Sequence, residues 1–269
     1  MRRKRTCFEK YLFPVFFLTI GLMLPTLAFA RDENREIEKA VKYESKTSLS
    51  LVMTKGNNKA FSFSLDTDQN LEFRKNRFNL KGRFIDSSSN GEKTAEIYSS
   101  QLKYDRKISP RAYLLGFVRY ERNKLSGYLF RIALSAGGGI SWVKNTKHQV
   151  TSELAFGWNN ERENQLSFSV TAPSQVLEQI LSSSFLSFVM THKWTGRISE
   201  SAQIIVQEIL FLNIEEPKDF RLNSFYEISS SINRYLALKT SVEIIYEHQP
   251  VEGYKNTDIF ILSSVVLSF

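Results

Sequence analysis

Three histidines, His148, His192 and His248, are the side chains of this chain best suited to general-base chemistry. A serine hydrolase needs a serine within hydrogen-bond reach of the histidine and a third group that orients the ring. His248 directly follows Glu247 and has serines nearby in the sequence, so it centres the enzymatic alternative. Sequence spacing does not show that a serine hydroxyl lies within hydrogen-bond reach of His248. A lone histidine at a strand end is more often a polar residue at the barrel rim. We therefore expect no catalytic residue and no enzyme.

The sequence also predicts no cofactor and no metal site. It contains no Cys/His or clustered carboxylate spacing typical of metal ligands. The run Gly137-Gly138-Gly139 is not a phosphate loop, because neither a helix nor a Lys-Ser/Thr pair follows it. Small residues in a strand more often relieve crowding where a sheet bends.

Charged residues at alternate strand positions are more informative than the histidines. If the strands close into a barrel, these side chains face its lumen, where they could tune ion passage. Alternatively they pair with one another and close the lumen, because buried charges need partners. We favour the narrow or plugged case. The charges expected to line the lumen are Lys81, Arg83, Lys103, Asp105, Arg119, Glu121, Arg131, Glu153, Arg221, Glu227, Lys239 and Glu243.

The elements that must position these charges are strands, because apolar and polar residues alternate from Tyr43 to the end of the chain. Turn residues separate the alternating segments, as in the Asn90-Gly91 pair. The expected strands are near 43–54, 59–66, 72–85, 95–106, 112–122, 128–143, 149–161, 182–194, 200–213, 220–233, 235–248 and 257–269.

The last of these strands indicates the architecture. One face of 257–269 is almost wholly apolar, from Ile259 through Val265 to the C-terminal Phe269. A strand of this kind, ending on an aromatic residue, resembles the closing strand of a bacterial outer-membrane barrel, in which the C-terminal aromatic is an insertion signal. Since a sheet in lipid must have no free edge, the last strand must pair with the first. We expect an all-β fold, a single transmembrane antiparallel up-and-down β-barrel of about 12 strands over residues 43–269.

Loop lengths support this fold. If both termini lie in the periplasm, the connections after even-numbered strands are periplasmic, and these are short. The outer connections include a serine-rich loop at 86–93 and a long interruption at 162–181, in which 174–181 has helix-like spacing. Short periplasmic turns and longer outer loops are typical of such barrels.

The N-terminus has the features of a secretory signal peptide. A basic segment containing Cys7 precedes the apolar run 11–27, and Ala28-Phe29-Ala30 is a cleavage pattern, so we expect 1–30 to be removed. Cleavage takes half of the formal charge of +8 with it, so the basic balance does not indicate nucleic-acid binding. The mature chain has no cysteine, and 31–42 is a short polar periplasmic segment.

Several segments together resemble the family of salt-induced outer-membrane proteins, small barrels of unknown function. They are Thr54-x-Gly56-Asn57, Arg119-Tyr120-Glu121, Leu125-Ser126-Gly127-Tyr128 with Arg131, Gly137-x-Gly139, Tyr246-Glu247 with Pro250, Gly253-Tyr254-Lys255-x-Thr257-Asp258 and the final Ser-Phe. The resemblance implies a small outer-membrane barrel linked to osmotic or envelope stress, and it implies no catalytic residue or substrate.

We therefore expect a barrel of the bacterial outer membrane with a structural or envelope-stress role, and a narrow channel for ions or small solutes. Its expected partners are outer-membrane lipid, lipopolysaccharide and the barrel-insertion machinery. The alternatives are a lipid-modifying hydrolase centred on His248 and a soluble periplasmic β-sandwich that acts as a binding module.

Overall fold

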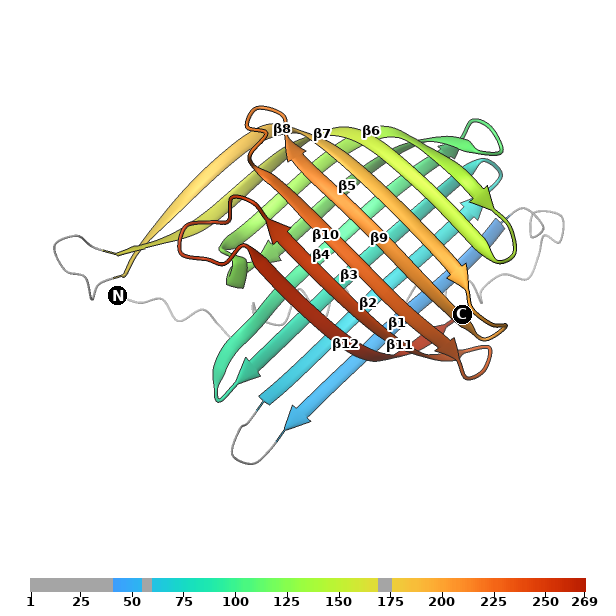
Figure 1. The fold of residues 1–269 in the computed structure, drawn as a ribbon, viewed down its shortest axis with the longest axis horizontal. Coiled ribbons are helices and arrows are strands. Elements are labelled where there is room, and N and C mark those ends of the chain that lie inside the picture. The colour runs from blue at the N-terminus through green and yellow to red at the C-terminus, as the bar shows by residue number, and fades with distance from the viewer. Residues whose placement is uncertain (1–40, 55–59, 169–175) are drawn as a thin grey trace, which may run out of the picture.

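A computed structural model describes residues 41–54, 60–168 and 176–269, which form a closed antiparallel barrel (Figure 1). The expected fold class is thereby confirmed. The strands are β1 (Val41–Thr54), β2 (Ala60–Phe73), β3 (Asn76–Ser89), β4 (Glu92–Lys107), β5 (Ala112–Asn123), β6 (Tyr128–Lys144), β7 (His148–Phe168), β8 (Val176–Arg197), β9 (Ala202–Asn213), β10 (Phe220–Ser231), β11 (Leu236–Glu247) and β12 (Thr257–Ser268).

The barrel closes by pairing its last strand with its first. β12 pairs antiparallel with β1 from Lys46–Ser268 to Leu49–Val265. Beyond that ladder, the Phe269 N–H donates to the Ser45 carbonyl at 2.9 Å, and the Ser45 N–H donates to the Phe269 carbonyl at 3.0 Å. Every other strand pairs with its neighbours in sequence, so backbone donors and acceptors are satisfied around the circumference.

Strand alternation gives the barrel two chemically different walls. The outer wall is apolar: on β12, Ile259 and Ile261 are 60% and 70% exposed. The inner wall is polar and crowded, and Ser64 and Ser187 are only 1% exposed. Successive side chains of a strand point to opposite faces, so the period of two in the sequence produces both walls at once.

The two ends of the barrel differ in their connections. At the end that carries the C-terminus, here called the base, adjacent strands are joined by 74–75, 108–111, 145–147, 198–201 and 232–235. The opposite end, here called the mouth, carries a 3-10 helix, η1 (Lys124–Ser126), and the longer loops 214–219 and 248–256. The β7–β8 hairpin projects beyond the other strands at the mouth (Figure 1).

Three local expectations were wrong. The second strand does not stop at 66 but continues to Phe73, because its polar residues face a polar lumen rather than forming a turn. The serine-rich segment 86–93 is mostly strand; its turn is Asn90-Gly91, whose φ values of +51° and +89° suit a two-residue hairpin. The interruption expected at 162–181 is mostly strand: 162–168 continues β7 and pairs with the start of β8, and 176–181 is strand rather than helix-like.

Several segments discussed above lie outside the described residues. They are the expected signal peptide, most of the segment 31–42, and Gly56-Asn57, which is part of the first segment that carries the family resemblance. In the part of the chain that is described, there is no helix with the length and apolar character needed to cross a bilayer.

Candidate functional site

Six charged side chains gather inside the barrel close to its mouth, and we call them the mouth network. Their alternating signs balance, and their side chains are between 7% and 17% exposed. The mouth network consists of Arg119, Glu121, Arg131, Glu161, Arg221 and Glu247.

Strand register places the members of this network beside one another. Arg131 on β6 lies directly between Glu121 on β5 and Glu161 on β7, and it bonds Glu161 at 2.6 Å. On the other side of the barrel, Arg221 on β10 is the cross-strand partner of Glu247 on β11. Opposite charges directly across a ladder attract, so each half of the network is stabilised locally.

The two halves also meet each other across the lumen. The Arg131 Nη1 lies 3.3 Å from Glu247 Oε1, and Arg221 Nη1 lies 3.8 Å from Glu121 Oε1. These pairs join β6 to β11 and β5 to β10, strands five positions apart in a ring of twelve. About eight strands already give an interior that side chains just fill, so a round barrel of twelve would be wider. The walls must therefore approach each other at this level and narrow the lumen.

Aromatic rings pack against the same guanidinium groups. The Arg131 guanidinium lies 3.6 Å from the centroid of the Tyr128 ring, and the Tyr128 hydroxyl donates to Glu247 at 2.6 Å. The Arg221 guanidinium lies 4.4 Å from the Phe211 centroid. Rings beside guanidinium groups exclude water and add cation–π attraction, so the network is held rigidly.

Two mouth loops meet each other beside the network. The Ser126 hydroxyl of η1 donates to the Asp258 carboxylate at the start of β12. Val251, in the loop between β11 and β12, is 3% exposed and lies against Gly127. A Cβ at Gly127 would lie 2.8 Å from Val251 Cβ and 2.9 Å from Tyr254 Cε2, and the φ of Gly127 is +85°. The segments around Ser-Gly-Tyr and Gly-Tyr-Lys-x-Thr-Asp thus meet at one place.

A second group of charges, the mid network, lies halfway down the lumen. Arg83 on β3 donates to Asp66 on β2 at 2.6 Å and also to Glu243 on β11. Lys239 lies 3.8 Å from Asp66. These four side chains are 10% to 23% exposed, and they connect β2 and β3 to β11, which lies four positions from β3 in the ring.

A third group, the base network, lies near the short turns. Lys103 pairs with Glu153 and lies 3.6 Å from Asp105, which also accepts from Arg77 at 2.7 Å. The Tyr113 hydroxyl donates to Glu153 at 2.7 Å, and its ring covers Gly139, where a Cβ would lie 2.3 Å from the ring. Position 139 therefore requires glycine, because the Tyr113 ring occupies the space that a side chain would need.

The charges expected in the lumen all lie in these networks or beside them. Lys81 faces Asp68 at 4.0 Å, with both side chains about 40% exposed. Glu227 has Ile205 and Ser241 as cross-strand neighbours, on the strand faces that point inward. Asp66, Glu161 and Arg77 were not predicted to line the lumen, the first two because they were expected at strand ends. Glu247 was expected to face inward, next to His248.

The histidines lie on the outer wall or at its edges. His248 stacks on Phe220, with 4.8 Å between ring centroids, and its Nδ1 lies 3.0 Å from the Tyr246 hydroxyl. His148 begins β7 at the base. His192 Nδ1 lies 3.0 Å from Ser152 Oγ, a pair that the sequence analysis did not identify. Within the described residues, no cluster of three or more His, Cys, Asp or Glu side chains could hold a metal ion.

A protein-family model described as "Protein of unknown function, DUF481" matches residues 47–269. An uncharacterized protein of Escherichia coli (strain K12), YdiY, is 22% identical over 211 residues, which cover 78% of this chain and 77% of that protein.

Three solved structures with similar folds have low sequence identity. The translocator domain of the autotransporter NalP from Neisseria meningitidis has a TM-score of 0.48 and 11% identity, covering 95% of this chain and 96% of that one. An outer-membrane channel from Pseudomonas putida F1 has a TM-score of 0.47 and 9% identity, with coverages of 86% and 95%. The NanC porin has a TM-score of 0.46 and 7% identity, with coverages of 84% and 97%. Values this low carry no argument about what this chain does.

Proposed function

The chain belongs to the DUF481 family, and we propose that it is a barrel of the bacterial outer membrane whose lumen is a narrow channel for ions or small solutes. In this proposal the base faces the periplasm and the mouth faces the outside. The mouth network is the constriction that limits passage.

The outer wall supports the membrane location. Leu134 and Phe156 are 56% and 64% exposed on neighbouring strands, and Ile261 is 70% exposed on β12. Monomeric soluble proteins rarely expose contiguous apolar patches of such extent, whereas a barrel in lipid requires an apolar band with polar residues inside. A β-sandwich is incompatible with the closed ring of strands.

The single observation that carries the channel proposal is the contact across the lumen between Arg131 and Glu247. It brings charged groups from near-opposite walls together in the path that a solute would take. Because the mouth network contains equal numbers of positive and negative side chains, we expect it to select only weakly between cations and anions. Because these side chains occupy the path, we expect only ions and small solutes to pass.

The experiment is a planar-bilayer recording of residues 31–269 refolded into lipid. Heat-modifiable migration on gels first establishes that the barrel has folded and inserted. The proposal predicts small, discrete conductance steps. A correctly folded barrel that never conducts would overturn the channel, and a chain that does not insert would overturn the membrane location.

The resemblance to salt-induced outer-membrane proteins supports a further proposal, a role in the envelope response to salt or osmotic change. A deletion strain should grow more slowly than its parent after a salt upshift, and growth unaffected at every salt concentration would contradict this role.

We also propose that Phe269 is read by the insertion machinery; the centroid of its ring lies 6.0 Å from that of Tyr235 at the base.

A second candidate function, acyl-ester hydrolysis, has one specific observation in its favour. Ser152 and His192 are hydrogen-bonded on the outer wall, and Glu208 is the cross-strand neighbour of His192 on β9. However, Glu208 accepts from Ser224 and from Tyr226, and the Trp142 indole N–H donates to Ser152 at 2.9 Å. The orienting group is thus engaged elsewhere, so the channel is better supported. Loss of phospholipid hydrolysis in Ser152→Ala would establish the hydrolase, and a wild-type protein without such activity would exclude it.

A further inference from the structure

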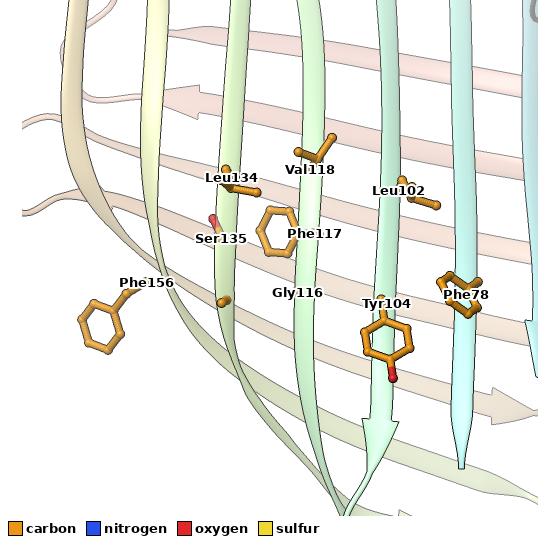
Figure 2. A pocket seen from close by; sticks show the side chains of 10 residues that line it. Phe78, Leu102, Tyr104, Gly116, Phe117, Val118, Leu134, Ser135 and Phe156 are labelled. Atoms are coloured by element: carbon orange, nitrogen blue, oxygen red, sulfur yellow. The ribbon is translucent and has the colours of Figure 1, made fainter. Parts of the chain in front are cut away.

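A groove runs along the outer wall of the barrel between two sets of aromatic rings. Its upper part is a hollow of about 580 Å³ over β3 to β7, and Figure 2 shows Phe78 and Tyr104 on one side of it and Phe156 on the other. Its lower part is a hollow of about 430 Å³ lined by Phe73, Asn76 and the same Phe78 and Tyr104. Phe78 and Tyr104 line both hollows, which together are called the wall groove; its lower end, at Phe73 and Asn76, lies at the base.

Strand register explains why the wall is hollow here. One row of outward positions reads Phe78, Tyr104, Gly116, Ala136 and Phe156 across five neighbouring strands. The two smallest residues therefore lie side by side between large rings. The Phe78 and Tyr104 ring centroids are 4.9 Å apart, which makes one firm flank of the groove. The floor is apolar and one to two residues wide, a shape that suits a single hydrocarbon chain.

The lower end of the groove lies beside a basic rim. Arg106 is the cross-strand partner of Asn76, and it is exposed on the outward side of β4. The turns at this part of the base contain four exposed basic residues and no acidic one, and Lys144 at the end of β6 adds a fifth. None of the six cations forms a salt bridge with a described residue. The basic rim consists of Arg74, Lys75, Arg106, Arg111, Lys144 and Lys147.

The remaining base turns do not repeat this pattern. The turn between β8 and β9 contains Glu200, three residues after Arg197 at the end of β8, and the turn between β10 and β11 has Arg234 as its charged residue. Positive charge and the apolar hollow therefore coincide on one side of the barrel. Basic residues near a membrane surface attract anionic headgroups.

We propose that the wall groove and the basic rim together bind one anionic phospholipid of the leaflet at the base. Its phosphate lies at Arg106, Arg74 and Lys75, and one acyl chain lies over Gly116 and Ala136. The inference rests on the proposed membrane location. A second copy fits this face poorly, because a two-fold contact between upright barrels would set one basic rim against the other.

The test is native mass spectrometry of the folded barrel, residues 31–269, released from micelles containing equal amounts of phosphatidylglycerol and phosphatidylethanolamine with the same chains. We expect one tightly held phosphatidylglycerol. Arg106→Gln and Arg74→Gln should each weaken its retention roughly fivefold, the factor that corresponds to one basic residue at a membrane surface. Gly116→Leu should reduce retention of both lipids, because the side chain fills the groove; its Cβ meets nothing closer than 3.7 Å.

Arg234→Gln is the matched control, since it removes one cation from the opposite part of the base. Equal retention of the two lipids by the wild type would overturn the inference. It would also be overturned if Arg106→Gln and Arg234→Gln weakened phosphatidylglycerol retention equally, or if a protein were bound in place of the lipid. Heat-modifiable migration in phospholipid vesicles separates this failure from failure of the membrane location. A barrel that inserts without lipid preference contradicts only the binding site.

Discussion

The mouth network and the mid network are both built from paired basic and acidic side chains but join different parts of the barrel. In the mouth network, Arg131 bonds a neighbour on β7 and also meets Glu247 five strands away. In the mid network, Arg83 on β3 bonds its neighbour Asp66 on β2 and also meets Glu243 on β11, four strands away. Both networks therefore join separated parts of the wall, and the contact in the mouth network reaches closer to the opposite wall. The number of strand positions that a charge pair spans indicates how far it narrows the lumen.

The two networks also differ in their contact with solvent. The Arg131 side chain is 8% exposed, and that of Arg83 is 23% exposed. A buried charge that loses its partner is left uncompensated, whereas a partly hydrated one can turn to water. Equivalent substitutions should therefore have larger effects at the mouth than in the middle of the lumen.

The largest effect is expected from Arg131→Ala. It leaves Glu121, Glu161 and Glu247 without the cation that they share, so unfolding should become easier by about 3–5 kcal/mol. Urea titration of the barrel in lipid vesicles measures this change. The double variant Arg131→Gln with Glu161→Gln is the control and should recover much of the loss. If Arg131→Ala were as stable as the double variant or more stable, the result would contradict an electrostatic network.

A smaller effect is expected from Gly127→Ala, where the two mouth loops meet. The new Cβ would lie 2.8 Å from Val251 Cβ, so overpacking costs about 1–3 kcal/mol on top of the unfavourable φ. Limited proteolysis should then cut the loop 248–256 faster. Gly91→Ala is the matched control, because its φ is also positive but no atom lies within 4 Å of the added Cβ. Equal cutting in both variants would argue against loop contact.

Arg83→Gln in the mid network should cost less, about 1–2 kcal/mol for lost charged hydrogen bonds. Lys239 remains 3.8 Å from Asp66 and compensates part of the change. The same urea titration applies. A loss as large as that of Arg131→Ala would remove the distinction between the two networks.

The smallest effect on stability is expected from Lys81→Ala. Its amine lies 4.0 Å from Asp68 and the pair is well hydrated, so the change should stay below about 1 kcal/mol. Ion selectivity should nevertheless shift towards cations, since one positive charge leaves the lumen. Reversal potentials in a salt gradient measure the shift. An unchanged reversal potential would place Lys81 outside the ion path.

Alternation in the sequence was sufficient to predict the strands and the two walls, because its period of two is a local property. The same signal failed in β2, where Asp68 and Asn70 read as turn residues but face a polar lumen and accept from Asn79 at 2.6 and 2.8 Å. It also failed beyond residue 161, because 162–165 is polar on both strand faces and 176–181 has helix-like spacing.

The networks themselves could not be predicted from the sequence. Arg131 and Glu247 are 116 positions apart, and Arg83 and Glu243 are 160 apart. Their meeting depends on which strands close the ring, on the stagger of the strands and on how far the ring is flattened. None of these is encoded in a single segment. The direct cross-strand pair of Glu121 with Arg131, in contrast, follows once the hairpin register between β5 and β6 is known.

The measurement that tests the central claim most directly is the single-channel conductance of three barrels in one bilayer system. They are the wild type, Arg131→Gln with Glu247→Gln at the mouth, and Arg83→Gln with Glu243→Gln in the middle. Both variants neutralise one ion pair and keep side-chain volume nearly constant. A constriction at the mouth predicts a several-fold rise in conductance for the mouth variant and little change for the mid variant. A rise of the same size in both, or in the mid variant alone, would contradict it.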